Sequence, residues 1–210
     1  VTAIATLLVA VPAWPTPDAG TFRVAAVQGN AKAGYFDPPE NRGDNLLDQY
    51  QATQAVLSED VDVVVWPEGA SDLDPLRVPA AAALFDQIAE DADAPLVAGT
   101  ITARGEEYFN TSLLWRAGEG AVDYYDKRHP VPFGEYVPDR EFWRQFAPDL
   151  IDMIAREYTP GSTDTVMNVG SAGREVLAGI AICFDIVDDA VMREAVTSGA
   201  QIIFAQTNNA

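Results

Sequence analysis

The chain has 210 residues and a formal net charge of -19, from 32 acidic and 13 basic residues. With 48% hydrophobic residues and 21% charged residues, the composition is typical of a globular domain that can bury a core. The negative charge argues against nucleic acid as a partner, and one cysteine excludes an internal disulfide or a cysteine-built zinc site. We therefore expect neither a metal nor another cofactor.

Residues 1–14, "VTAIATLLVAVPAW", are uncharged and fall short of the roughly 20 residues that a membrane helix needs. Two interpretations are open: the end of a membrane helix whose earlier part is missing, or a buried segment of a soluble domain. The absence of an amphipathic period favours the membrane helix. Residues 15–21 then form a proline-containing linker, and residues 22–210 form one globular domain.

The elements of that domain follow one another as strands and helices. We predict a strand over 22–28, a polar helix over 41–58, a strand over 61–69 and a second helix over 79–92. The run "VDVVVWPEG" at 61–69 is β-branched on both faces, as in a central parallel strand. A third strand is predicted over 94–102.

The second half of the chain contains two predicted hairpins. Residues 108–127 alternate around the turn Gly118–Gly120, and residues 165–185 form a hairpin that ends in a buried strand. Between them, 129–163 is predicted to be rich in loops. A helix over 188–198 and a strand over 200–208 follow. Strands alternating with helices indicate an α/β layered domain in which antiparallel strands join a parallel core. Because the sequence stops just after a core strand, we expect more of the domain to follow.

Three ionisable residues each follow a predicted strand. Glu68 comes after "VVVWP", Lys127 after "VDYYD" and Cys183 after "AGIAI". Each alone has an ordinary explanation: a loop acid, a solvated lysine and a cysteine that fills the core. Active sites of α/β sheets gather beyond the carboxyl ends of the strands, so their shared placement favours a common site.

The chemistry of these three groups is complementary. A thiol with an ordinary pKa of about 8.5 needs a base or a nearby cation to become a nucleophile. A carboxylate can act as that base, and a lysine ammonium can stabilise the oxyanion that forms. The three residues therefore predict acyl transfer through a thioester. A Cys–His pair is the competing hypothesis, but the single histidine, His129, fits a structural role in its loop better.

The motifs "VVVWPEGA", "YYDKRHPVPFGEYVP" and "GIAICFD" occur in this order and resemble the nitrilase superfamily. That superfamily uses a Glu-Lys-Cys triad on an α-β-β-α sandwich. The run "KRHPVPFGEYVP" resembles the apolipoprotein N-acyltransferase branch, membrane enzymes with a nitrilase-like domain on the extracytoplasmic face of the bacterial cell membrane. The resemblance covers residues 22–209 and implies that 22–210 is a nitrilase-like catalytic domain without its C-terminal part.

The resemblance also implies roles for single residues. Glu68 matches the general base, Lys127 the lysine that stabilises the oxyanion, and Cys183 the nucleophile. Glu135 matches a second glutamate that positions the lysine or assists proton transfer. Asn110 matches a position that supports the site.

The two residues after the cysteine depart from the branch pattern. The branch has Tyr and Glu there, whereas this chain has Phe184 and Asp185. The backbone N–H of Phe184 is expected to complete the oxyanion hole, and Asp185 is expected to support the site from a shorter stem. These departures are expected to affect secondary contacts and catalytic efficiency rather than the triad.

Aromatic residues in the loop-rich section have two interpretations. They could line an entry path for lipid, or they could simply pack the domain. The residues concerned are Phe133, Tyr136, Phe142, Trp143 and Phe146.

The reaction implied by the resemblance has two steps and two lipid partners. Cys183 attacks the sn-1 ester of a phospholipid, and the acyl chain then passes to the N-terminal diacylglyceryl-cysteine of an apolipoprotein. The membrane is a partner through helices outside this chain. Two alternatives remain open: a soluble nitrilase-type amidase or carbamoylase with the same triad, and a catalytically silent nitrilase-like binding module.

Overall fold

The computed structural model describes residues 20–30, 42–154, 156–171 and 173–208. The predicted membrane segment 1–14 and residues 15–19 of the linker lie outside the described residues. In the part of the chain that the structure describes, no helix is both long and apolar enough to cross a membrane.

The larger of two β-sheets has five strands in the order β1-β2-β3-β4-β5. Strands β1 (Val24–Ala26), β2 (Val63–Val65) and β3 (Leu96–Arg104) are parallel. Strands β4 (Glu107–Arg116) and β5 (Gly120–Asp126) continue the sheet in antiparallel pairing. The prediction of a parallel core joined by antiparallel strands is confirmed.

The smaller sheet has three strands in the order β6-β7-β8. Strand β6 (Val166–Asn168) pairs antiparallel with β7 (Leu177–Ile182), which pairs parallel with β8 (Ile202–Gln206). The second predicted hairpin is thereby confirmed. Strand β7 ends immediately before the cysteine, at the 3-10 helix η2 (Cys183–Val187).

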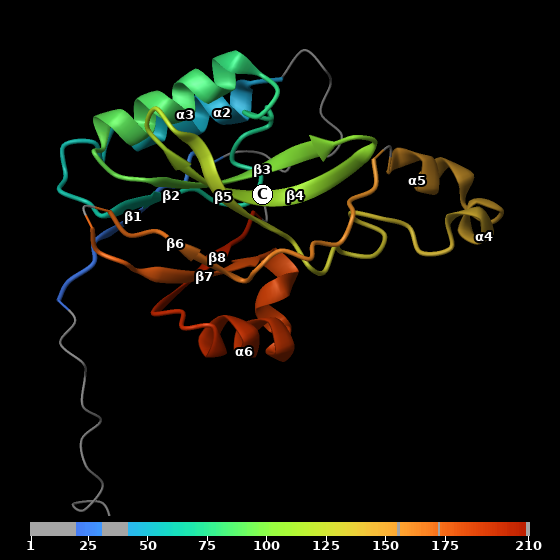
Figure 1. Cartoon of the computed structure of the whole chain (residues 1–210). Helices are drawn as coiled ribbons and strands as arrows, with labels where there is room; N and C mark the ends of the chain where they lie inside the picture. Colours follow the sequence, from blue (N-terminus) through green and yellow to red (C-terminus); the bar gives the residue numbers. More distant parts are fainter. Residues whose placement is uncertain (1–19, 31–41, 155, 172, 209–210) are drawn as a thin grey trace, which may run out of the picture.

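The sheets face each other and carry helices on their outer faces (Figure 1). Helices α2 (Asp44–Thr53) and α3 (Pro79–Asp91) cover the larger sheet, and α6 (Asp189–Thr197) covers the smaller one. This is the predicted α-β-β-α sandwich. Helix α2 is shorter than the predicted range 41–58, because the left-handed Gly43 precedes it and turns follow Thr53.

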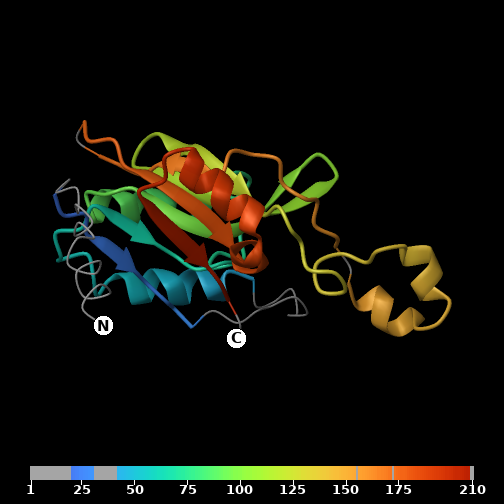
Figure 2. The ribbon, with the colours of Figure 1, turned by 90° about the horizontal axis from the view of Figure 1, so that it is seen from below.

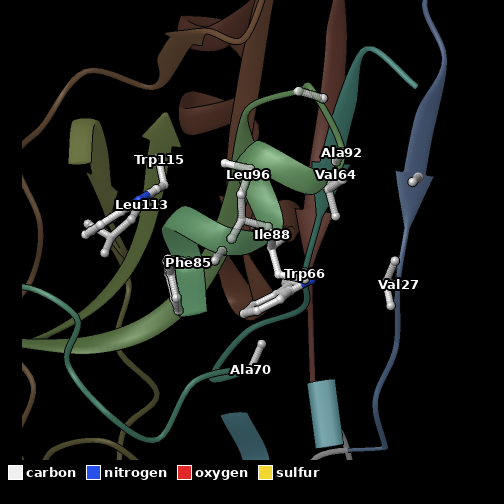
Figure 3. Packing of buried hydrophobic residues seen from close by; sticks show 14 of the residues in the cluster. Val27, Val64, Trp66, Ala70, Phe85, Ile88, Ala92, Leu96, Leu113 and Trp115 are labelled. Atoms are coloured by element: carbon white, nitrogen blue, oxygen red, sulfur yellow. The ribbon is translucent and has the colours of Figure 1, made fainter. Parts of the chain in front are cut away.

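The core beneath the helices is built on aromatic rings (Figure 3). Phe85 of α3 packs edge-on against Trp66 and Trp115, with both ring centroids at 5.3 Å. Successive side chains of strand β4 point to opposite faces of the sheet, and each face is covered by a core. Leu113 and Trp115 therefore join this cluster, and Leu114 joins the cluster between the sheets. Mainly aliphatic side chains of both sheets, together with Tyr125 and Phe204, fill that second core.

The section 129–163 was predicted to be rich in loops, and it contains two short helices. Helices α4 (Arg140–Arg144) and α5 (Pro148–Met153) project from the sandwich (Figures 1 and 2). Five and six residues are too few to give a reliable helical period in the sequence. We call the segment 140–153 the arm.

Candidate active site

Glu68 lies in the turn after β2 and is held close to strand β3. A side-chain Cβ on Gly99 would lie 2.3 Å from the Pro67 carbonyl oxygen and 2.7 Å from the Glu68 Cα. Only glycine allows this approach of the two backbones. The buried Glu68 carboxylate is thereby directed toward the end of β5.

Lys127 follows β5 and is buried between two carboxylates. Its Nζ lies 3.1 Å from Glu68 Oε1 and 2.9 Å from Glu135 Oε2, and its side chain is only 1% exposed. Burial alone would lower the pKa of Lys127, but the charges of Glu68 and Glu135 outweigh it and raise that pKa. The ammonium therefore stays charged at neutral pH.

Asn110 of β4 fixes the two carboxylates relative to each other. Its Nδ2 donates to Glu68 Oε1 at 2.8 Å and to Glu135 Oε1 at 2.9 Å. The backbone N–H groups of Val131 and Asn208 donate to the remaining oxygens of Glu135 and Glu68, at 2.7 and 3.2 Å. Each carboxylate is therefore held by several donors, and the cluster is rigid.

Cys183 lies at the end of β7, half-buried, with a left-handed φ of 48°. A non-glycine residue in this conformation is uncommon and marks a constrained turn. Its thiol lies within electrostatic range of Glu68. Burial and the negative charge of Glu68 raise the pKa of Cys183, and Lys127 acts in the opposite direction. The resting group is thus a neutral thiol beside a carboxylate.

Asp185 is fully buried beneath the cysteine turn. Its carboxylate accepts hydrogen bonds from Tyr125 Oη at 2.8 Å and from the backbone N–H of His129 at 2.9 Å. Burial, followed by the charge of Asp185, raises the pKa of Tyr125. Asp185, which has a shorter side chain than the glutamate of the branch pattern, is therefore well accommodated.

His129 pairs with Asp188, with Nε2 at 2.7 Å from Oδ2. Since the charges that act on the Cys183 thiol are those of Glu68, Lys127 and Glu135, a carboxylate base is favoured over a Cys–His pair.

The predicted lipid-path residues are more exposed than the buried cluster, and two of them, Phe133 and Tyr136, flank Glu135 in the chain. Phe133 and Trp143 are exposed and stack edge-on at 5.5 Å, at the base of the arm. Tyr136 is half-buried, and its carbonyl oxygen accepts the N–H of Phe133. The Phe184 ring is exposed next to the cysteine.

The structure adds Tyr158, which the sequence analysis missed. Its backbone N–H donates to the carbonyl oxygen of Glu135 at 2.8 Å. Burial, with the negative charge of Glu135, raises the pKa of Tyr158 to about 12. In the sequence, Tyr158 stands between the arm and a glycine-containing turn, and no motif there indicates that it lies near two carboxylates.

Among the described residues, no group of three or more histidine, cysteine, aspartate or glutamate side chains could hold a metal ion. The site consists of a thiol, two carboxylates, an ammonium and an amide.

The sandwich and the position of the cysteine point to one family of enzymes. The carbon-nitrogen hydrolase family matches residues 23–210, and the chain belongs to it. A solved amidase from Nesterenkonia sp. AN1 has the same fold, with a TM-score of 0.61 at 19% identity, over 89% of this chain and 67% of that one.

Within the family, the curated relatives confirm the predicted branch. The chain is 33% identical to the apolipoprotein N-acyltransferase of Mycolicibacterium smegmatis over 98% of its length. It is 26% identical to that of Vibrio parahaemolyticus over 94% of its length. The chain spans only 37% and 39% of these two relatives.

Proposed function

We propose that this chain is the catalytic part of an apolipoprotein N-acyltransferase that moves a fatty acyl chain from a phospholipid to a lipoprotein. The observation that carries the proposal is that Glu68 and Lys127, buried and paired at 3.1 Å, both act electrostatically on the thiol of Cys183. The names of the curated relatives support the choice of transferase over amidase.

In the first step, Glu68 takes the proton of the Cys183 thiol while the sulfur attacks the sn-1 ester carbonyl of the phospholipid. Lys127 and the backbone N–H of Phe184 stabilise the oxyanion. The C–O bond of the ester breaks, and the lysophospholipid leaves with the proton from Glu68. The products are a thioester on Cys183 and a lysophospholipid.

In the second step, the α-amino group of a diacylglyceryl-cysteine attacks the thioester. Glu68 takes a proton from the amine, the C–S bond breaks, and the sulfur recovers its proton. The acyl chain ends on the amine as an amide. Glu135 and Asn110 hold Lys127 and Glu68 in place through both steps.

Two lipid substrates explain a membrane location. We propose that residues 1–14 end a membrane helix, that 15–21 link it to the domain, and that the domain lies on the extracytoplasmic face of the bacterial membrane. The arm, with Trp143, and the preceding residues Phe133 and Tyr136 then face the lipid.

The test is mass spectrometry of the full-length protein after incubation with phospholipid. We expect an acyl adduct on the peptide that contains Cys183, together with free lysophospholipid. A Cys183→Ala variant is the control and should form neither. If the wild-type protein cleaves a small amide instead and carries no acyl group from phospholipid, the amidase alternative holds.

A further inference from the structure

Arg128 directly follows Lys127 and joins the end of β5 to helix α6. Its guanidinium forms a bidentate pair with the Glu194 carboxylate, with both N–O distances at 2.8 Å. The same guanidinium donates to the carbonyl oxygen of Thr163 at 2.9 Å. Two parallel hydrogen bonds to one carboxylate fix direction as well as distance.

Two further contacts run between the same segments. The Asp185 carboxylate accepts the backbone N–H groups of Arg128 and His129, at 3.3 and 2.9 Å. His129 Nε2 lies 2.7 Å from Asp188 Oδ2, at the N-terminus of α6. The chain after Lys127 is thus attached to η2 and α6 at three places.

These attachments matter because the two reacting groups belong to different sheets. Lys127 directly follows a strand of the larger sheet, and Cys183 directly follows a strand of the smaller one. We propose that Arg128 is a positioning residue that, through Glu194, holds the cysteine turn at its working distance from Lys127. The inference rests on the proposed roles of Lys127 and Cys183.

The charges around the thiol give the proposal a measurable consequence. Glu68 and Glu135 make Cys183 harder to ionise, and Lys127 makes it easier. Since Lys127 is paired with both carboxylates, a cysteine turn that moves away from Lys127 also moves away from Glu68 and Glu135, and the thiol becomes more exposed. Burial and the carboxylates together outweigh the ammonium, so a displaced thiol should ionise more easily. Removal of either Arg128 or Glu194 should therefore have the same effect on the thiol.

A purely electrostatic effect would have opposite signs in the two variants. Loss of the positive Arg128 would make the thiol harder to ionise, whereas loss of the negative Glu194 would make it easier. The direction of the change in each variant therefore separates positioning from distant charge.

The experiment compares Arg128→Gln and Glu194→Gln in the full-length protein. The rate at which iodoacetamide alkylates Cys183 is measured from pH 6 to pH 10 by mass spectrometry of its peptide. We expect both variants to react several-fold faster than wild type at pH 8, and both midpoints to move downward. The exchanged variant, Arg128→Glu with Glu194→Arg, should return part of the way to the wild-type profile.

Arg23→Gln, which removes the exposed pair between Arg23 and Asp60, is the matched control and should leave the profile unchanged. Opposite shifts in the two single variants would overturn the proposal, as would a lowered melting temperature with an unchanged profile. If a single variant does not fold, the exchanged variant decides, and a folded exchanged variant without any recovery of the profile also overturns it. Absence of an acyl adduct in wild type would contradict the proposed function and leave this comparison intact.

Discussion

The ammonium of Lys127 is a buried charge whose two nearest charged neighbours are carboxylates. Its raised pKa means that the stabilisation from these pairs is complete at pH 7, below the unfolded value of about 10.4, and is lost as the pH rises through the folded value. The same group that we propose for catalysis therefore also stabilises this end of the sandwich.

Replacing Lys127 by Met should abolish thioester formation and lower stability at pH 7. Glu68 and Glu135 would remain buried without their cation, which costs about 3–5 kcal/mol. Urea unfolding measures this loss. Arg23→Met, at an exposed pair, should change stability by less than about 0.5 kcal/mol. An equal loss in the two variants would contradict the role of burial.

A second prediction concerns the pH dependence of the Cys183 thiol. Since burial and Glu68 raise its pKa, alkylation of wild type should have a midpoint above the ordinary thiol value of about 8.5. Glu68→Gln removes a negative charge and should lower that midpoint. The same variant should slow thioester formation about 10²–10⁴-fold, because the general base is lost. Faster alkylation without slower acylation would remove Glu68 from the role of base.

At the scale of elements, the strand ends could be predicted from the sequence and their junctions could not. The β-branched run before Glu68 and the apolar run before Cys183 are strong signals, and the structure has strands there. The hydrogen bonds that Asp185 accepts from the end of β5 join residues about 60 positions apart, and no local pattern reveals such pairing. Tyr158 was missed for the same reason.

Strand β3 sets the position of Glu68 through Gly99. Gly99→Ala should force the backbone at Pro67 outward, cost about 1–3 kcal/mol and reduce the rate of acylation. Gly170→Ala, whose Cβ would lie 1.9 Å from the Arg174 carbonyl oxygen in the β6–β7 hairpin, is the control. It should destabilise the fold without a comparable loss in the rate per folded molecule. Similar rates in the two variants would contradict the role of Gly99.

At the scale of the whole molecule, the layered architecture followed from the alternation of strand and helix patterns. The arm was missed because its helices are short and their apolar side chains are exposed, as on Phe142, Phe146 and Leu150. Exposed apolar side chains give no core-facing period for a sequence pattern to reveal. Phe142 and Phe146 pack on each other, with ring centroids 5.2 Å apart, and in the proposed function their exposed faces meet lipid.

The sandwich and the arm should differ in stability. Phe85→Ala removes a ring that packs between two tryptophans and should cost about 3–5 kcal/mol. Phe146→Ala, at a side chain that is 69% exposed, should change stability by less than about 0.5 kcal/mol. Thermal and urea unfolding provide both values. A large loss for Phe146→Ala would mean that the arm packs on another surface of the protein.

The most direct test of transferase activity is a chase of the thioester in the full-length protein. Cys183 is first loaded from phospholipid, and a peptide with an N-terminal diacylglyceryl-cysteine is then added. We predict that the acyl chain moves from Cys183 to the amino group of the peptide in a single turnover. Release of the chain as free fatty acid, at a rate that the peptide does not change, would contradict the account.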